Sequence, residues 1–171
     1  MTWIKLHRGE CLFRQGEMGS LYRLHTGLLK VVRYQADGQA LLFNILLPGE
    51  LFPHHSLVSP KPYHGNAIAM MDSEVEVINS EDWYHQLEEN PYLYREVSLS
   101  LQHKLRMMQE RIDQLTTVTA KERFNAFIHW FKQEFPDIDP LSIFTQEEIS
   151  QFMGLRRETL NRLLRKPANF S

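Results

Sequence analysis

The sequence holds a single cysteine, Cys11, among its 171 residues. One thiol excludes a disulfide framework or a four-cysteine metal cluster within one chain. The chain also lacks the run of about 18 apolar residues that a membrane-spanning helix needs. Its start, MTWIKLHRGE, lacks the long apolar segment of a signal peptide. These absences predict a protein of a reducing, cytoplasmic compartment with no membrane partner.

Sequence signatures of common enzyme classes are also missing. The chain has no G-x-S-x-G motif, no phosphate-binding Walker loop and no dinucleotide fingerprint. Asp72 and Glu74 are close in sequence, but nothing around them suggests a setting for acid–base chemistry. We therefore predict that the protein is not an enzyme and has no catalytic residues.

Glycine is scarce after the first third of the chain, because seven of the eight glycines lie between Gly9 and Gly65. This spacing predicts short strands separated by turns over the front of the chain. The clearest hairpin is LLKVVRYQADGQALLFNILLPGE, in which Asp37-Gly38 marks the turn. HGNAIAMMDSEVEVINS supplies two more strands. Many short strands at this spacing are typical of an antiparallel barrel or jelly roll.

Helical patterns begin after Ser80, which is a plausible N-cap, and Pro91 opens a long stretch without glycine. Apolar residues then recur at heptad spacing, in the order Leu101, Leu105, Met108, Ile112 and Leu115. This stripe indicates a dimerisation helix, and a helix that covers its own barrel is the alternative that the spacing leaves open. A further helix, TAKERFNAFIHWFKQEF, ends at Pro136, and PDIDP is predicted to be a turn.

Basic residues gather near the end of the printed sequence. From Thr145 onward there are five Lys/Arg against three Asp/Glu, whereas residues 1–144 hold 14 against 18. A small basic region on an acidic body indicates contact with a polyanion. A solvated helix face with the same composition is the alternative that charge alone leaves open.

The same region has the pattern of two short helices joined by a tight turn. Thr145 and Glu148 form a capping box at the start of the first helix, and Gly154 breaks it. The apolar positions expected to face inward are Ile149, Met153, Leu155, Leu160, Leu163 and Leu164. This arrangement predicts a helix-turn-helix whose second helix could read a major groove. A plain helical hairpin with a charged surface is the alternative.

The segment TQEEISQFMGLRRETLNRLLRK resembles the DNA-binding element of the Crp/Fnr transcription regulators, a bacterial family. GECLFRQGEMGSLYRLHTGLLKVVRYQADGQALLFNILLPGEL is similar to the cyclic-nucleotide-type β-roll of that family, including its closing GEL. The resemblance implies an α+β fold: an N-terminal antiparallel β-roll (jelly roll), a long dimerisation helix and a C-terminal helix-turn-helix domain. The expected boundaries are 1–88, 89–117 and 118–171.

The resemblance also implies which residues contact double-stranded DNA. Arg157, Glu158 and Arg162 match the base-reading set of the catabolite activator branch of the family, so a TGTGA-like half-site is expected. Thr145 and Thr159 fall at phosphate-contacting positions, and Asn161 and Arg156 complete the candidate set. A homodimer would present two recognition helices about 34 Å apart, one turn of DNA. RNA polymerase is a further candidate partner.

Three departures from the family pattern give a second hypothesis. Arg156 stands where Ser or Thr usually caps the recognition helix, although an arginine there could contact a phosphate. The sequence stops at PANFS without most of the usual β-hairpin wing, and it starts without the usual helical lead-in. A family member shortened at both ends could be a dimerising interaction protein with weak or no DNA binding.

The residues expected at the effector pocket also depart from the family pattern. Gly49 and Glu50 match the ribose-binding Gly-Glu, but Tyr63 and His64 stand where an Arg-Ser pair usually binds the phosphate. A charged phosphate needs strong donors, and Lys61 is the only Lys or Arg between Arg33 and Arg95. Cyclic AMP binding in the usual mode is therefore not expected, and the effector is not identified.

No metal site or other cofactor is predicted. His54 and His55 are adjacent and His64 lies nearby in sequence, but adjacent residues of a strand point to opposite sides. One metal shared by these histidines would be geometrically awkward, and the segment lacks the His-x-His and glutamate of a cupin. Cys11 would act as a redox sensor only if exposed and of low pKa, and we expect it to pack in a strand.

Overall fold

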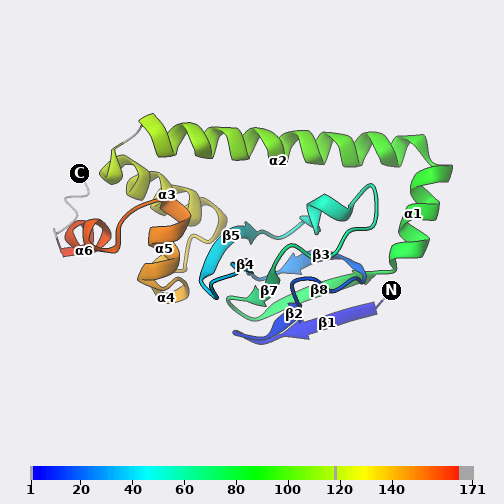
Figure 1. The fold of residues 1–171 in the computed structure, drawn as a ribbon, viewed down its shortest axis with the longest axis horizontal. Helices are drawn as coiled ribbons and strands as arrows, with labels where there is room; N and C mark the ends of the chain where they lie inside the picture. Colours follow the sequence, from blue (N-terminus) through cyan, green and yellow to red (C-terminus); the bar gives the residue numbers. More distant parts are fainter. Residues whose placement is uncertain (1, 118, 166–171) are drawn as a thin grey trace. The chain divides into compact units, whose positions relative to one another are not determined.

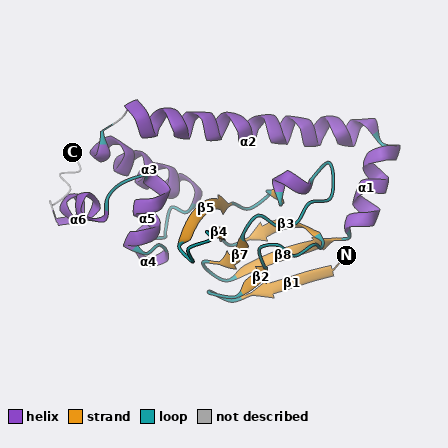
Figure 2. Cartoon of the chain, in the orientation of Figure 1, coloured by secondary structure: helices purple, strands orange, loops and turns teal. Residues whose placement is uncertain are grey.

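The computed structural model describes residues 2–117 and 119–165, and the chain divides into two compact units, Met1–Leu105 and Arg106–Ser171. The first unit holds all the strands in the described part, and the second is helical (Figures 1 and 2). The boundary between the two units falls inside the long helix. This two-part division does not test the predicted three-part division, with boundaries at 88 and 117, which remains a prediction. Within the described ranges, no helix has the length and apolar character needed to cross a membrane.

Two four-stranded antiparallel sheets make up the β-roll. Their strand orders are β1-β8-β3-β6 and β2-β7-β4-β5. The strands are β1 (Thr2–Leu6), β2 (Cys11–Phe13), β3 (Leu21–Thr26), β4 (Leu29–Tyr34), β5 (Ala40–Leu46), β6 (Leu51–Phe52), β7 (Asn66–Ala69) and β8 (Ser73–Ile78). Only β4 and β5 are sequence neighbours that pair within one sheet. The chain therefore crosses between the sheets at the other connections, which confirms the predicted antiparallel roll.

The predicted hairpin around Asp37-Gly38 is confirmed. β4 and β5 pair antiparallel from Leu29↔Leu46 to Tyr34↔Ala40. Across the turn, the backbone N of Gln35 donates to the carbonyl O of Gln39 at 2.9 Å. Gly38 has φ 82°, a left-handed conformation that glycine adopts at no steric cost. The turn therefore favours a glycine at this position, and it brings β4 and β5 into antiparallel pairing.

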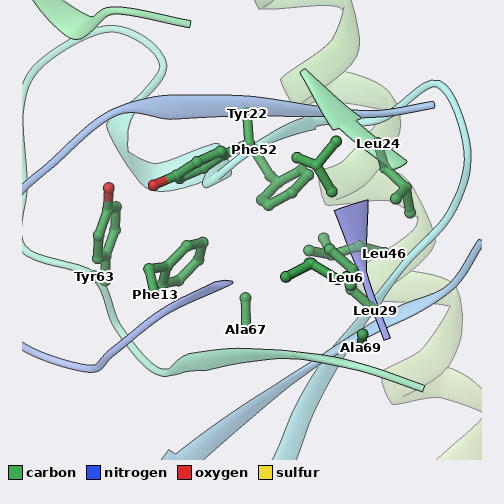
Figure 3. Packing of buried hydrophobic residues seen from close by; sticks show 11 residues of the cluster. Leu6, Phe13, Tyr22, Leu24, Leu29, Leu46, Phe52, Tyr63, Ala67 and Ala69 are labelled. Atoms are coloured by element: carbon green, nitrogen blue, oxygen red, sulfur yellow. The ribbon is translucent and has the colours of Figure 1, made fainter. Parts of the chain in front are cut away.

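The core between the sheets is rich in aromatic rings. Figure 3 shows Phe13, Tyr22, Phe52 and Tyr63 side by side, with aliphatic residues such as Leu24 filling the rest. The ring centroids of Phe13 and Tyr63 are 4.0 Å apart, and those of Tyr22 and Phe52 are 5.7 Å apart. Each ring buries about 150–250 Å² of surface on folding. The interior of the roll is therefore packed by its own side chains.

Helices α1 (Ser80–Glu89) and α2 (Pro91–Thr117) follow the roll. The predicted cap Ser80 is wrong by one residue: Asn79 is the N-cap, and its side chain accepts from the backbone N of Asp82 at 3.0 Å. Asn79 has φ −59° and ψ 128°, a non-helical conformation, so it is the last residue before the helix. The two helices pack on the roll through a second buried cluster, which comprises Leu21, Leu57, Trp83, Leu87 and Val97.

The second unit contains the end of α2 together with α3 (Ala120–Glu134), α4 (Pro140–Ile143), α5 (Gln146–Met153) and α6 (Arg157–Arg165). Its buried residues include Phe127 and Phe131 of α3, Phe144 in the loop before α5, and Leu160 of α6. The short α4 was not predicted. It begins at the last residue of the predicted PDIDP turn, where the Asp139 side chain accepts from the backbone N of Leu141 at 3.0 Å.

This order of an antiparallel roll, a long helix and C-terminal helices confirms the predicted α+β class. The prediction that most of a wing is missing concerns residues 166–171, which lie outside the described residues, and it remains a prediction.

Candidate nucleic-acid interface and effector site

Helix α5 begins with the predicted capping box. The backbone N of Glu148 donates to Thr145 Oγ1 at 3.2 Å, and the backbone N of Thr145 donates to Glu148 Oε2 at 2.8 Å. Ile149 and Met153, one turn apart, are both buried, with 0% and 5% of their surface exposed. The first helix of the predicted pair is therefore fixed at its start by the cap and along its length by its apolar face.

Gly154 ends α5 in a left-handed conformation with φ 60°. The backbone N of Leu155 then donates to the carbonyl O of Ser150 at 2.8 Å, which closes the last turn of the helix. Such a six-residue closure around a left-handed glycine is a common way to end a helix. The predicted glycine turn is confirmed, and it redirects the chain into α6.

Helix α6 starts directly after Arg156. The backbone N of Leu160 donates to the carbonyl O of Arg156 at 3.1 Å, the first i to i−4 bond of this helix. Arginine has no side-chain acceptor, so the usual cap is absent from this position, as the sequence predicts. Leu160 is fully buried and Leu163 and Leu164 are half-buried, so these residues anchor the helix to its unit.

The predicted base-reading residues lie together on one face of α6. Arg157, Glu158 and Arg162 are exposed, and Asn161 is half-buried. At about 100° per residue, these four positions span roughly 140° of the helix surface, away from Leu160. The structure thus brings two guanidinium groups and one carboxylate to a single accessible face.

The other predicted contacts lie at the edges of this face or on the preceding helix. Thr159 is half-buried on another side of α6, Arg156 is exposed at its start, and Thr145 is exposed at the start of α5. Arg165 is a further candidate that the sequence reasoning missed. It lies seven residues after Glu158, about two helical turns, a spacing that returns to the same face of a helix and could have revealed it.

The face has the functional groups that direct readout of DNA uses. A guanidinium can donate two hydrogen bonds to O6 and N7 of guanine, and a carboxylate can accept from N4 of cytosine. An α-helix fits the major groove of B-form DNA. The arrangement can therefore present both kinds of contact in one groove.

The predicted heptad residues of α2 do not all share one environment. Leu105, Met108 and Ile112 are 57%, 50% and 58% exposed. Leu101 instead packs against the buried cluster of the first unit. Leu115 lies against the glycine turn, where a Cβ on Gly154 would stand 2.5 Å from Leu115 Cδ2. Leu115 is 37% exposed, and we call the three residues with at least half of their surface exposed, Leu105, Met108 and Ile112, the apolar seam of α2.

Glu50, the predicted ribose ligand, is paired within its own chain. Its Oε2 lies 2.9 Å from Lys104 Nζ of α2 and 3.2 Å from His54 Nε2, and its Oε1 accepts from the backbone N of Leu47 at 3.3 Å. Burial disfavours the charged carboxylate, but the hydrogen bond from His54 and the charge of Lys104 outweigh it. The pKa of the Glu50 carboxyl is therefore lowered. Gly49 holds the adjacent turn, where its backbone N donates to the carbonyl O of Leu24 at 2.7 Å.

Tyr63, the predicted phosphate-side residue, points into the core. Only 4% of its surface is exposed, and its ring stacks on Phe13 (Figure 3). Its hydroxyl donates to the carbonyl O of Ser20 at 2.8 Å. Burial, followed by the proximity of Tyr22, raises the pKa of the Tyr63 hydroxyl, so this side chain stays neutral. His64 is exposed. These residues do not fit a cyclic nucleotide bound in the usual mode, because the buried phenol offers no cation to its phosphate.

The three neighbouring histidines do not converge on one point. His54 and His55 lie in a short 3₁₀ turn (His54–Ser56), not in a strand. His54 contacts Glu50, whereas His55 Nε2 lies 3.0 Å from the carbonyl O of Pro62 and its ring is 4.2 Å from that of His64. Among the residues placed in the structure, no group of three or more His, Cys, Asp or Glu side chains could hold a metal ion.

Cys11 lies at the start of β2, as expected, but the expectation that it packs there is wrong, because it is exposed. Desolvation by its neighbours raises the pKa of the thiol. A raised pKa opposes formation of the reactive thiolate.

The chain is similar to proteins of a known family. Residues 3–90 match the family described as cyclic nucleotide-binding domain. The chain is 28% identical over 159 residues to the cyclic AMP receptor protein of Thermus thermophilus, a match that covers 92% of this chain and 72% of that protein. It is 27% identical over 163 residues to a CRP-like cAMP-activated global transcriptional regulator of Mycobacterium tuberculosis, covering 92% and 73%.

Solved structures show the same fold. FixK2 from Bradyrhizobium japonicum superposes with a TM-score of 0.78 at 20% identity, over 95% of this chain and 82% of that one. A CRP/FNR-family transcriptional regulator from Thermus thermophilus gives a TM-score of 0.75 at 20% identity, over 95% and 84%. At this level of identity the likeness supports the fold, and the residue-level site rests on this chain's own side chains.

Proposed function

The chain belongs to the Crp/Fnr family of transcription regulators, and from that membership we propose that it binds a TGTGA-like palindrome as a homodimer, through α6. The family is one of regulators and not of enzymes, so the site is a binding surface. A cytoplasmic location and a contact with RNA polymerase belong to the same proposal.

The exposed face of α6 carries this proposal. Arg157, Glu158 and Arg162 project from a helix that starts three residues after the Gly154 turn and is anchored by the buried Leu160. Each well-placed bidentate contact discriminates against a wrong base by about 1–3 kcal/mol. The two arginines would read guanine and Glu158 would read cytosine. Arg156, Thr145, Thr159 and Asn161 would position the helix through phosphate or edge contacts.

The apolar seam of α2 supports the homodimer. Large apolar side chains that are exposed at heptad spacing on one chain are typically buried against a second helix in a coiled coil. Leu105, Met108 and Ile112 follow one another at intervals of three and four residues, and each has at least half of its surface exposed. We propose that a second copy of the chain packs on this seam, so that two α6 helices meet the two halves of a palindrome.

The effector of this protein would not be cyclic AMP in the usual mode. Tyr63 is buried against Phe13 where the resemblance expects an arginine for the phosphate. Glu50 is paired with Lys104 and His54 where it would otherwise meet the ribose. A nucleotide would have to displace both arrangements and would gain no strong cation in return. The packed roll therefore favours regulation that does not depend on this nucleotide.

Fluorescence anisotropy with a labelled TGTGA-N6-TCACA duplex and a scrambled duplex tests the proposal. At low salt both duplexes should bind, because phosphate contacts do not depend on sequence. Near physiological salt the palindrome should bind more tightly than the scrambled duplex by at least about 10³-fold. Weak binding that is equal for both duplexes and is lost in salt would reject the proposal and favour a dimerising interaction protein instead.

A further inference from the structure

A side chain of α2 holds the end of α5. Arg111 Nη2 donates to the carbonyl O of Phe152 at 2.7 Å, and the guanidinium carbon lies 4.2 Å from the centroid of the Phe152 ring. The last four carbonyl groups of a helix have no donor within the helix. Arg111 supplies such a donor and also covers the ring of the same residue, so it contacts both the backbone and the side chain of Phe152.

Phe152 is itself held firmly by α3. Its ring stacks on Trp130 with a centroid distance of 5.9 Å and meets the edge of Phe127 at the same distance. Phe127 is 4% exposed. The Arg111 guanidinium thus lies on a half-buried ring that also contacts two aromatic side chains of α3, and it is bound to the backbone of the same residue. These contacts together define its position more closely than a single surface ion pair would.

A second contact lies one turn further along α2. Leu115 Cδ2 occupies the space beside Gly154 that a Cβ would otherwise fill. Arg123 of α3 donates from Nη1 to the carbonyl O of Leu115 at 2.9 Å. The end of α2 thus contacts both Phe152, at the end of α5, and Gly154, in the turn that leads into α6.

The same part of α2 carries two residues of the apolar seam, Met108 and Ile112, on either side of Arg111 in the sequence. All of these residues belong to the unit Arg106–Ser171. In a dimer, the position of each α6 relative to the seam determines the distance between the two recognition helices. DNA half-sites must match that distance and its helical phase.

We infer that Arg111 is a positioning residue that fixes α6 relative to Met108 and Ile112 of the seam and so sets the half-site spacing that the dimer accepts. This inference rests on the proposed function. Arg111 would touch no base and no phosphate. Its effect would appear as selectivity among spacings, which a residue with only a stabilising role would leave unchanged.

The chain offers a matched control on the same helix. Arg106 is also on α2, but its side chain is 79% exposed and pairs with Glu110 at 3.1 Å, one turn along the helix surface. Arg106→Gln and Arg111→Gln remove the same charge and introduce the same side chain. Arg111→Lys keeps the charge but loses the planar group that stacks and donates at once.

The test measures the fluorescence anisotropy of TGTGA/TCACA duplexes with N5, N6 and N7 spacers, titrated with the wild-type chain and with each variant. Wild type and Arg106→Gln should prefer one spacer clearly, since one base pair changes both the distance and the rotation of a half-site. In Arg111→Gln the ratio between the preferred and the other spacers should fall at least about threefold, and Arg111→Lys should lie between. Circular dichroism confirms folding, and Arg111→Lys serves alone if Arg111→Gln does not fold.

An Arg111 variant that weakens binding to all three duplexes by the same factor, with the spacer preference intact, would overturn the inference. A wild-type protein that does not distinguish these duplexes from a scrambled one would instead reject the proposed function, and the inference with it. The two failures are distinguishable because the first appears only in the variants.

Discussion

Lys104 Nζ lies 2.9 Å from Glu50 Oε2, and this ion pair joins α2 to the loop between β5 and β6 within the first unit. The two side chains are only 14% and 20% exposed. His54 approaches the same oxygen at 3.2 Å. The carboxylate that the family resemblance assigns to a ribose thus binds two groups of its own chain. The same contacts that occupy Glu50, and so oppose cyclic AMP binding, are therefore expected to stabilise the roll.

Removing the ammonium group should destabilise the roll. In Lys104→Met the Glu50 carboxylate would lose its closest cation while remaining largely out of water. A partly buried charge that loses its partner costs about 2 kcal/mol, although His54 and the backbone N of Leu47 remain as partners. Urea unfolding of the purified variant and the wild type at pH 7 measures the loss.

The control for this variant is Lys5→Met. Lys5 Nζ lies 3.2 Å from Glu74 Oε1, but the two side chains are 81% and 41% exposed, so water screens the pair. Its loss should cost less than about 0.5 kcal/mol. Combining Lys104→Met with Glu50→Gln should restore part of the stability, because no unpaired charge remains. Equal effects of the two lysine variants would show that the Lys104 pair does not stabilise the roll.

Stability should fall on mild acidification because of His55. Partial burial holds the pKa of the His55 imidazole below its ordinary value of 6.5, and the charges of His64 and His54 act in the same direction. The unfolded chain then binds a proton near pH 6.5 that the folded chain binds only at lower pH. This contribution is complete above pH 6.5 and is lost as the pH falls through the folded-state pKa.

Urea midpoints measured between pH 7.5 and 5 should show this decline in wild type and a shallower one in His55→Gln. His85→Gln is the control, since His85 is exposed and pairs only with Glu89 across one helical turn among the contacts described. If His55→Gln keeps the full slope, other groups cause the decline.

Cyclic AMP should not raise the melting temperature of the protein. A ligand present at 100 times its Kd would add about 2.7 kcal/mol to the free energy of unfolding, a change that thermal unfolding detects easily. The buried Tyr63 and the paired Glu50 leave the phosphate and ribose without their usual partners. Differential scanning fluorimetry with millimolar cyclic AMP tests this expectation. A melting temperature that rises with nucleotide concentration would show that the roll opens to admit it.

A charge in the apolar seam should break the dimer. Ile112 is 58% exposed in the single chain, and a glutamate there would place two like charges against apolar partners in the dimer. We expect Ile112→Glu to raise the dimer dissociation constant by at least about tenfold, measured by analytical ultracentrifugation. Leu99→Glu is the control: Leu99 is 48% exposed on a different face of α2 and should leave the dimer intact. Dimers of equal stability in both variants would place the interface elsewhere.

Local signals in the sequence were sufficient for the elements around the candidate site. The capping box at Thr145, the glycine break at Gly154 and the hairpin turn at Gly38 each depend on residues within a few positions of one another. Such signals act through backbone conformation and short-range hydrogen bonds, so a single sequence reveals them. The N-cap was misplaced by one residue because Asn79 and Ser80 are both good capping residues.

Contacts between residues far apart in the chain could not be predicted from the sequence. Lys104 meets Glu50 across 54 positions, and Arg111 meets Phe152 across 41. No periodicity marks these pairs. The heptad stripe likewise could not show that Leu101 and Leu115 contact their own chain while Leu105, Met108 and Ile112 each have at least half of their surface exposed. Which side of an apolar stripe faces the body depends on tertiary packing, which the spacing does not encode.

The most direct test of base reading by α6 is the binding of Arg157→Ala to a set of single-base variants of the TGTGA palindrome. In wild type each altered guanine should cost about 1–3 kcal/mol. Arg157→Ala should lose this discrimination at one base pair and keep it at the others, whereas Arg156→Ala should weaken binding to every duplex alike. If Arg157→Ala also weakens all duplexes by one common factor, Arg157 contacts only phosphate, and the account of α6 as the reading helix is contradicted.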